Sequence, residues 1–411
     1  MNTPSIYRDN ILIEACGPIL TEAALLRHLI ALPPNPVRSS SWHRHLAMHE
    51  MQCIEEIFIP REVSQRLALT ISICVRNGYR PRNPAWAATA AMLRGKPHPQ
   101  YALAAPLMLS VCGISGSGKS KSLLRSAMQF PWQVVLHEKF PRVVGAFQQI
   151  IYLCIDVPPS GKLVDLAKEL LRKTDEALGT DEFSAICRSA SARPWDLFNL
   201  WLLVARRQFV GIVIFDEAQN LFKLETKRAR EKGRKLENFP RELRLVEDET
   251  LKAILVIANT WKIPVAFSMT PDGMEAFNTR LAATQRLCGE GHYQFPLSAS
   301  PDEEYFSKTL FPALATYQYL PKPMTIGPNE RAVFYEETAL VPRILIKAWR
   351  LGQRVAIEQG AKHFGVEHVR AAMATYLDPV RPAVKALLSK DPMGLRLYED
   401  LLPPPKFWDS V

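Results

Sequence analysis

The sequence has no long hydrophobic run and no paired cysteine motif. Within its 411 residues, no apolar stretch approaches the ~18 residues needed to cross a bilayer, and residues 1–30 contain Glu and Arg where a secretory signal would be apolar. The seven cysteines are scattered, odd in number and include no C-x-x-C. This distribution excludes a disulfide framework and favours a reduced, cytoplasmic protein with no membrane partner.

Several catalytic arrangements are also missing. No Ser-His-Asp set and no nuclease-like cluster of carboxylates stands out. His45, His49 and Cys53 would share one face of a helix, with His43 nearby, but this spacing matches no recognised zinc signature. We interpret these four residues as an ordinary polar helix face and predict no metal there.

A complete phosphate-binding loop is present. Residues 113–120 read GISGSGKS, the G-x-x-x-x-G-K-[ST] pattern, between a strand-like run at 107–112 and a helical pattern at 121–128. Backbone N–H groups of such a loop surround phosphates, Lys119 reaches the β- and γ-phosphates, and the Ser120 hydroxyl can ligate Mg²⁺. The predicted nucleotide contacts are Gly113, Ser115, Gly116, Ser117, Gly118, Lys119, Ser120 and Lys121.

Two carboxylates follow a later strand. The apolar run 211–215 ends in Asp216 and Glu217, the Walker B pattern. Asp216 can hold Mg²⁺ through water, and Glu217 can orient the attacking water or accept its proton. Kinases for small molecules lack this second carboxylate, so the pair predicts ATP hydrolysis.

Four further residues have candidate roles in that site. Thr270 follows the next strand, where a polar side chain can bridge the water and the γ-phosphate (sensor 1), although it can equally cap the helix that follows. Arg280 and Arg286 are both candidate arginine fingers, which would act on a neighbouring subunit if subunits assemble head to tail. Arg343, at the start of a long helix, is a candidate sensor 2.

The periodicity predicts an α/β protein with a parallel five-stranded sheet flanked by helices. Predicted strands include 149–157, 264–268 and 292–297, and a helix is expected over 161–178 between Ser160 and Gly179. The predicted domains are a mostly helical N-terminal extension (1–100), the α/β core (101–300), a helical lid (301–395) and a tail (396–411).

Positive charge is concentrated in two places. The formal net charge is +10, and residues 223–244 hold nine Lys or Arg against four Glu. The segment 76–82 (RNGYRPR) adds three arginines. Solubility alone can explain such an excess, but its uneven distribution favours a nucleic-acid partner.

In combination, these features resemble the AAA+ ATPases and, more narrowly, the TnsC-like regulators of heteromeric bacterial (TnsABC-type) transposons. The matching segments occur in one order from residue 7 to about 390: Tyr7-Arg8-Asp9-Asn10, Ile13-Glu14-Ala15, Ile59-Pro60, Val75-Arg76-x-Gly78-Tyr79, Arg82-Asn83-Pro84, Gly113–Ser120, Tyr152-Leu-x-Ile155-Asp156, Ala177-Leu178-Gly179, Asp216-Glu217-x-Gln219, Ile263-Pro264-Val265 and Pro379-Val-x-Pro382.

The resemblance implies an AAA+ core that binds ATP and Mg²⁺ and polymerises on double-stranded DNA as a ring or helical filament. Such regulators connect a target-selection protein to the transposase and disassemble on hydrolysis; in a bacterium this implies association with the nucleoid. It implies sensor 1 at Thr270, the finger at Arg286, and sequence-independent DNA-backbone contacts by Lys162, Lys168, Arg172 and Lys173. The loop departs from the family in ending Lys-Ser-Lys, and the basic insert 223–244 is longer than expected.

Two other functions fit part of the pattern. An initiator-like or STAND-like signalling ATPase would act on a protein or an origin, and a sequence-specific reader would need a helix-turn-helix after the lid, which 365–411 does not show. A translocating helicase would sustain DNA-stimulated turnover and separate strands. We expect the transposition regulator.

Overall fold

The computed structural model describes residues 4–36, 43–93, 105–189, 192–221, 248–278 and 285–390. Two compact units emerge. Unit 1 comprises residues 1–22, 66–112 and 123–293, and unit 2 comprises 23–65, 113–122 and 294–411. The N-terminal hundred residues are therefore divided between the units, whereas the boundaries expected near 100 and 300 stay a prediction.

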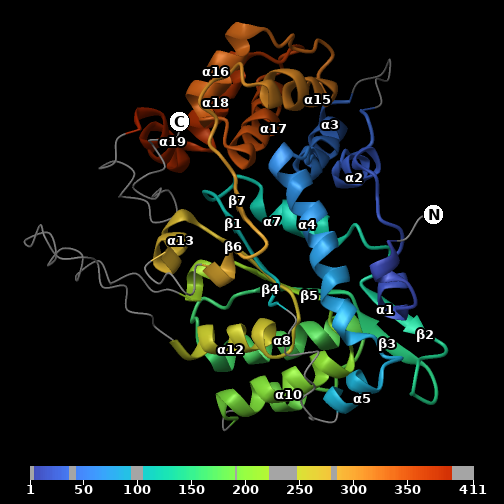
Figure 1. Cartoon of the computed structure of the whole chain (residues 1–411). Helices are drawn as coiled ribbons and strands as arrows, with labels where there is room; N and C mark the ends of the chain where they lie inside the picture. Colours follow the sequence, from blue (N-terminus) through green and yellow to red (C-terminus); the bar gives the residue numbers. More distant parts are fainter. Residues whose placement is uncertain are drawn as a thin grey trace, which may run out of the picture. The chain divides into compact units, whose positions relative to one another are not determined.

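Five strands form one sheet in the order β4-β5-β6-β1-β7 (Figure 1). The pairs β4–β5, β5–β6 and β6–β1 are parallel, so the carboxyl ends of these four strands share one edge. The strand bounds are Met108–Cys112 (β1), Tyr152–Asp156 (β4), Ile212–Asp216 (β5), Val265–Met269 (β6) and His292–Gln294 (β7).

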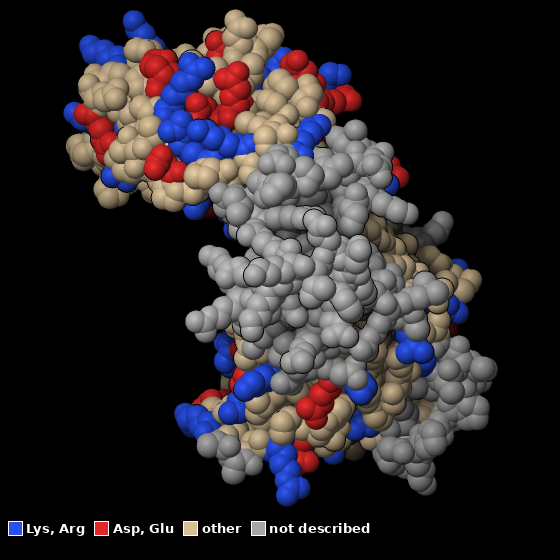
Figure 2. Space-filling view, turned by 90° about the vertical axis from the view of Figure 1, so that its left-hand side faces the viewer, with Lys and Arg blue, Asp and Glu red and all other residues tan. Residues whose placement is uncertain are grey.

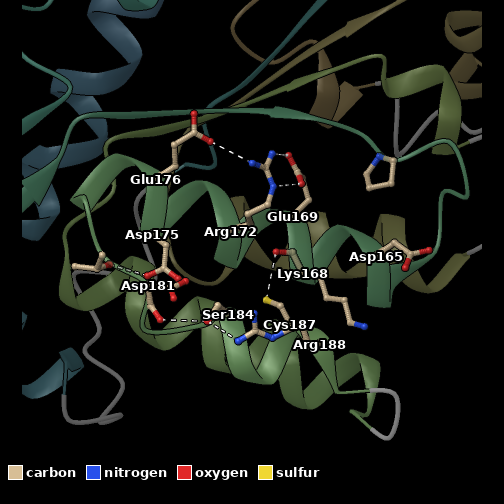
Figure 3. A pocket seen from close by; sticks show the side chains of 12 residues that line it. Asp165, Lys168, Glu169, Arg172, Asp175, Glu176, Asp181, Ser184, Cys187 and Arg188 are labelled. Carbon is tan, nitrogen blue, oxygen red and sulfur yellow. Dashed lines mark hydrogen bonds and ion pairs between the residues drawn. The ribbon is translucent and has the colours of Figure 1, made fainter.

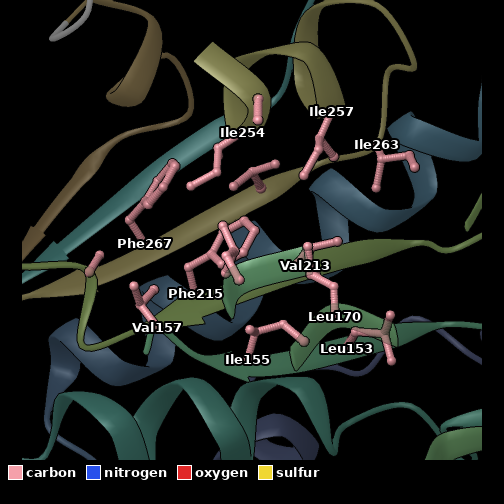
Figure 4. Close-up of a cluster of buried hydrophobic side chains, with 14 of the residues drawn as sticks. Leu153, Ile155, Val157, Leu170, Val213, Phe215, Ile254, Ile257, Ile263 and Phe267 are labelled. Atoms are coloured by element: carbon pink, nitrogen blue, oxygen red, sulfur yellow. The ribbon is translucent and has the colours of Figure 1, made fainter. Parts of the chain in front are cut away.

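Helices cover the sheet because its central strands are apolar on both faces. Every residue of β1 and β6 is buried, and in β5 only Asp216 is not. Side chains of β4, β5 and β6 pack with Leu170 of α8 and with Ile254 and Ile257 of α12 (Figure 4). The covering helices of this cluster are α8 (Leu163–Leu178), α10 (Pro194–Arg207) and α12 (Asp248–Asn259).

The C-terminal end of helix α4 (Glu62–Tyr79) is fixed to the other elements of unit 1 by buried polar contacts. The Tyr79 hydroxyl donates to the Phe209 carbonyl at 2.9 Å, and the Arg82 guanidinium donates to the Gly78 and Val210 carbonyls at 2.8 and 2.7 Å. A Cβ on Gly78 would lie 2.6 Å from Pro264, so this close approach requires glycine.

This packing corrects the interpretation of the basic segment 76–82. Arg76 and Arg82 are 3 % and 2 % exposed, and both donate to backbone carbonyls. Only Arg80 of the three arginines is exposed. Two of these charges therefore serve folding and are inaccessible to a nucleic acid.

A second correction concerns the strand expected over 149–157. The chain instead forms β3 (Phe147–Ile150), which pairs antiparallel with β2 (Val134–His137), and then β4. Between them, the Ile151 N–H donates to the Gln133 carbonyl at 2.8 Å. Continuous hydrophobicity did not reveal that the chain changes pairing partner at this residue.

One helix boundary and one connector also differ from expectation. Helix α8 begins at Leu163 because Gly161 has φ +66° and its missing Cβ leaves room for the Asn220 carbonyl oxygen. Gly179, at φ +68°, ends α8 as predicted. The connector expected over 80–101 contains a short 3₁₀ turn, η3 (Arg80–Arg82), and helix α5 (Ala87–Leu93).

Unit 2 contains the helical segment that follows the sheet. Its core joins Trp349, Phe334 and Phe311 in successive ring contacts, with centroids 5.4 to 5.5 Å apart. The helices are a π-helical turn, η5 (Tyr305–Leu310), α15 (Phe311–Thr316), α16 (Pro328–Thr338), α17 (Pro342–Glu358), α18 (Val366–Thr375) and α19 (Arg381–Ser389), with a 3₁₀ turn, η6 (Asp378–Val380). The expected all-helical region is confirmed.

The remaining elements are short. They are η1 (Ser5–Tyr7), α1 (Ile11–Glu14), α2 (Glu22–Leu29), α3 (Arg44–Glu50), η2 (Met51–Glu56), α7 (Lys119–Ala127), α9 (Ser184–Arg188), η4 (Ala218–Leu221) and α13 (Pro271–Asn278). All seven cysteines are unpaired thiols. Within the described residues, no helix has both the length and the apolar character that a membrane span requires.

We expect Arg82→Ala to lower the free energy of unfolding by about 3 kcal/mol, because it leaves buried carbonyls unpaired. Urea denaturation followed by circular dichroism measures this change. Arg80→Ala is the matched control, since its side chain is exposed, and should change stability by less than about 0.5 kcal/mol. Equal effects of both substitutions would contradict the structural role of Arg82.

Candidate nucleotide site

The P-loop follows β1 directly in the chain and lies in unit 2. Gly116 and Gly118 adopt φ +79° and +100°, the left-handed region that glycine tolerates best. The Lys119 ammonium donates to the Ile114 carbonyl at 3.1 Å, so the lysine lies against the loop's own backbone. The Ser117 Oγ is buried and has no hydrogen-bond partner among the described residues.

The loop also packs on the helical segment of unit 2. The Arg343 N–H donates to the Gly116 carbonyl at 3.2 Å, and a Cβ on Gly116 would lie 3.0 Å from the Arg343 Cβ. Ile114 is buried in one apolar cluster with Val341 and with Leu387 of α19. The structure therefore brings the predicted sensor 2 residue to the P-loop through its backbone, while its side chain is exposed.

Two residues after the loop anchor its helix within unit 2. The Lys121 ammonium donates to the carbonyls of Glu55, Glu56 and Ile57 at 3.0 to 3.3 Å. Ser122 exchanges a hydrogen bond with Ser64, with 3.0 Å between their Oγ atoms. In this arrangement Lys121 holds the end of η2, and its predicted contact with nucleotide stays a prediction.

The predicted Walker B residues lie at the end of β5 in unit 1. Asp216 is the last residue of the strand, and its Oδ1 accepts the Glu217 N–H at 2.9 Å. Glu217 is exposed and has φ +54°, an uncommon backbone conformation for a non-glycine residue. Such local strain is typical of functional positions.

Thr270 lies one residue beyond β6, the neighbour of β5. It is 4 % exposed, and its Oγ1 is buried with no hydrogen-bond partner in the described part of the chain. The side chain therefore does not cap α13, although the Thr270 carbonyl accepts the Met274 N–H at 3.1 Å. A buried hydroxyl without a partner is available to a ligand group, as a sensor 1 residue requires.

The structure adds Gln219, to which we assigned no role from the sequence. Its side chain joins Glu217 to the Thr270 backbone. The two acids were recognisable from their position after a strand, whereas Gln219 stood out only as part of the segment Asp216-Glu217-x-Gln219, which attaches no role to it.

The candidate arginine fingers are only partly described. Arg286 is exposed within a short helical stretch, and its carbonyl accepts the Gly289 N–H at 3.2 Å. Arg280 and the basic insert 223–244 lie outside the described residues. The finger role stays a prediction.

The predicted DNA contacts on α8 have unequal surroundings. Arg172 forms ion pairs with Glu169 and Glu176 at 2.5 and 3.3 Å, and Lys173 pairs with Glu176 at 3.0 Å. The hydrogen bond from Lys173 lowers the pKa of the Glu176 carboxyl. Lys168 is half-buried, whereas Lys162 is exposed at the N-terminus of the helix, with no acidic partner among the described residues.

A cavity of about 580 Å³ lies beside these ion pairs, between α8 and α9 (Figure 3). Five carboxylates and three cations line it, so its charges largely compensate one another. On the face drawn in Figure 2, basic and acidic side chains are likewise interspersed over the part that the structure describes. Neither view shows a broad surface of one sign.

Among the described residues, one group of three could hold a metal ion: His363, Glu367 and His368. The His368 Nδ1, however, accepts the Gly365 N–H at 3.1 Å, which caps helix α18. The Nδ1 lone pair of His368 is therefore not available to a metal ion. The residues His43, His45, His49 and Cys53 form no such group.

The donor atoms present fit ATP and Mg²⁺. Gly113 has no space for a Cβ, which would lie 2.8 Å from the Ser117 Oγ. This buried Oγ has no hydrogen-bond partner among the described residues, so it can bind a phosphate oxygen. The hydroxyl of Ser120 and the carboxylate of Asp216 are hard oxygen donors of the kind that Mg²⁺ prefers.

Comparison with known families supports this assignment of the fold. Residues 104–275 match the family model of the AAA domain. The matched segment contains the P-loop, Asp216, Glu217 and Thr270. The expected fold class is confirmed: an α/β core with a five-stranded sheet flanked by helices, within a segment that matches the AAA domain.

Similar solved structures share little sequence with this chain. The Aeropyrum pernix ORC2 protein with ADPNP and ADP is 11% identical, with a TM-score of 0.39, over 72% of this chain and 66% of that one. Drosophila ORC bound to DNA is 13% identical, with a TM-score of 0.42, over 89% of this chain and 72% of that one. A variant of Thermotoga maritima RUVB is 13% identical, with a TM-score of 0.34, over 71% of this chain and 67% of that one. No curated protein matches the sequence.

We expect Gly116→Ala to weaken ATP binding at least about tenfold, because the new methyl group displaces Arg343 and distorts the loop. Isothermal titration calorimetry measures the affinity. Gly360→Ala is the matched control: φ is +74° there, but nothing lies within 4 Å of the added Cβ. Both variants incur a similar backbone cost of about 1 kcal/mol, so only Gly116→Ala should lose affinity. Unchanged affinity in Gly116→Ala would refute the importance of this contact.

Proposed function

We propose that this chain is an ATP-dependent regulator of DNA transposition. It binds ATP, oligomerises on duplex DNA as a ring or helical filament, and connects a target-selection protein to the transposase. Hydrolysis of ATP then disassembles the oligomer. The match to the AAA domain supports the nucleotide chemistry. The short sequence segments that resemble TnsC-like regulators, and that occur in one order from residue 7 to about 390, support the narrower role in transposition.

Each part of the site has one task in this proposal. The P-loop backbone and Lys119 bind the phosphates, and Ser120 and Asp216 hold Mg²⁺, which neutralises charge on the phosphate oxygens when bound. Glu217 orients the attacking water and accepts its proton, and the Thr270 hydroxyl supplies a hydrogen bond. Arg286 would complete the site of an adjacent subunit, which links hydrolysis to assembly.

The observation that carries the hydrolytic part is the buried Thr270 Oγ1. It follows β6, while Asp216 and Glu217 follow the adjacent strand β5 at the same edge of the sheet. A buried hydroxyl that lacks a partner costs free energy unless a ligand satisfies it. Its position one residue beyond the strand, beside two carboxylates, fits a hydrogen bond to water or γ-phosphate.

We expect Glu217→Gln to bind ATP, lose hydrolysis and accumulate on duplex DNA, because the oligomer is no longer disassembled by hydrolysis. Lys119→Ala should fail to assemble, since it cannot hold the triphosphate. Electron microscopy and sedimentation with DNA, with ATP or a non-hydrolysable analogue, measure both outcomes. If both variants assembled equally without nucleotide, ATP-controlled assembly would be wrong.

DNA affinity should fall steeply with salt and depend little on sequence. We expect Lys162→Ala to reduce the slope of log affinity against log salt by about one, the loss of one phosphate contact. Arg172→Ala is the matched control, since two glutamates already bind that guanidinium. Fluorescence anisotropy with two unrelated duplexes measures this slope for both variants. A larger change of slope in Arg172→Ala than in Lys162→Ala would contradict the assignment of Lys162 as the phosphate contact.

A further inference from the structure

The Gln219 side chain bridges two elements of the hydrolytic half-site. Its amide nitrogen donates to the Glu217 carboxylate, and its carbonyl oxygen accepts the Thr270 N–H at 3.3 Å. Gln219 lies in the turn η4, which follows β5, whereas Thr270 follows β6. One side chain therefore connects the proposed water-activating residue with the end of the neighbouring strand.

The two partners determine the orientation of the amide. A backbone N–H can only donate, so the group facing Thr270 must be the carbonyl oxygen. An ionised carboxylate can only accept, so the group facing Glu217 must be the NH₂. A flipped amide would place donor against donor and acceptor against acceptor. Only the observed orientation of the amide therefore satisfies both partners.

The surrounding backbone leaves the turn little freedom. A Cβ on Gly273 of α13 would lie 2.8 Å from the Gln219 Cβ, so α13 packs directly on the turn. The Asn220 Nδ2 donates to the Val157 carbonyl at 2.8 Å, which ties the other side of the turn to the end of β4. The turn is held from both sides, and the base of the Gln219 side chain is held with it.

Glu217 needs such support because its own conformation is strained. Its backbone is left-handed and its side chain is exposed, so packing does not restrict the carboxylate. In the described structure, the Glu217 N–H donates to Asp216, its carbonyl accepts the Asn220 N–H at 3.0 Å, and its carboxylate accepts a hydrogen bond from Gln219. Of these three, only the bond from Gln219 reaches the carboxylate and restricts its orientation.

We propose that Gln219 is the positioning residue for Glu217: it orients the carboxylate and sets its place relative to Thr270. This inference rests on the proposed ATPase function. Gln219 itself contacts no reacting atom in this scheme and acts through Glu217. A carboxylate that must align a water molecule loses rate when its orientation is no longer restricted.

Two substitutions separate orientation from simple packing. Gln219→Ala removes both hydrogen bonds, and we expect kcat to fall about tenfold while KM for ATP changes little. Gln219→Glu keeps the length of the side chain and an acceptor for the Thr270 N–H but opposes a second carboxylate to Glu217. We expect kcat to fall at least as far in this variant. Wild-type kcat in Gln219→Glu would overturn the proposal, because a packing role tolerates this change.

Asn220→Ala is the matched control in the same turn. It removes the side-chain hydrogen bond to Val157, the residue after β4, and keeps the backbone N–H that donates to the Glu217 carbonyl. It should therefore lower the melting temperature more than it lowers kcat. A loss of kcat equal to that of Gln219→Ala would indicate that the turn as a whole matters, and the specific role of Gln219 would be refuted.

A double-mutant cycle tests the contact without nucleotide. The shifts in melting temperature of Glu217→Ala and Gln219→Ala should add to more than the shift of the double variant, because both single variants remove the same hydrogen bond. Additive shifts together with unchanged kcat would overturn this inference and leave the ATPase function intact. A wild-type protein that does not hydrolyse ATP, despite non-additive shifts, would refute the proposed function and the catalytic role of Gln219 with it.

Discussion

The parallel register of β5 and β6 is the constraint on which the hydrolytic half of this protein depends. Phe215 pairs with Phe267, so the residues that follow the two strands emerge at one edge of the sheet. This single alignment places Asp216, Glu217 and Thr270 in neighbouring positions although more than fifty residues separate them in the chain. The stacked rings of Phe215 and Phe267, with centroids 5.7 Å apart, help to fix that alignment from within the core.

Much of this arrangement could be predicted from the sequence. The glycine loop, the apolar strands and the two acids after β5 each have a strong local pattern, because burial on both faces demands uninterrupted apolar residues. Gly179 ends α8 where its left-handed conformation is needed. Patterns of this kind reflect backbone geometry, and backbone geometry is the property that short sequences encode best.

The features that escaped prediction depend on contacts between distant segments. Arg76 and Arg82 resemble a basic patch in the sequence, and their burial depends on distant acceptors such as the carbonyls of Gly17 and Val210. The start of α8 depends on the Asn220 carbonyl beside Gly161, and the ion pairs of Arg172 depend on which helix face is outward. Charge counts alone could not distinguish cations used in folding from those exposed to a partner.

Through Ile114, the stability of the P-loop also depends on the packing of the C-terminal helices. Its side chain is buried in the same apolar cluster as Val384, Ala386 and Leu387 of α19, so the free energy that keeps the loop folded is partly that of helix packing. Substitutions in α19 that make no contact with nucleotide would therefore alter how tightly nucleotide is held. We therefore expect residues that pack the C-terminal helices to influence ligand affinity as well as stability.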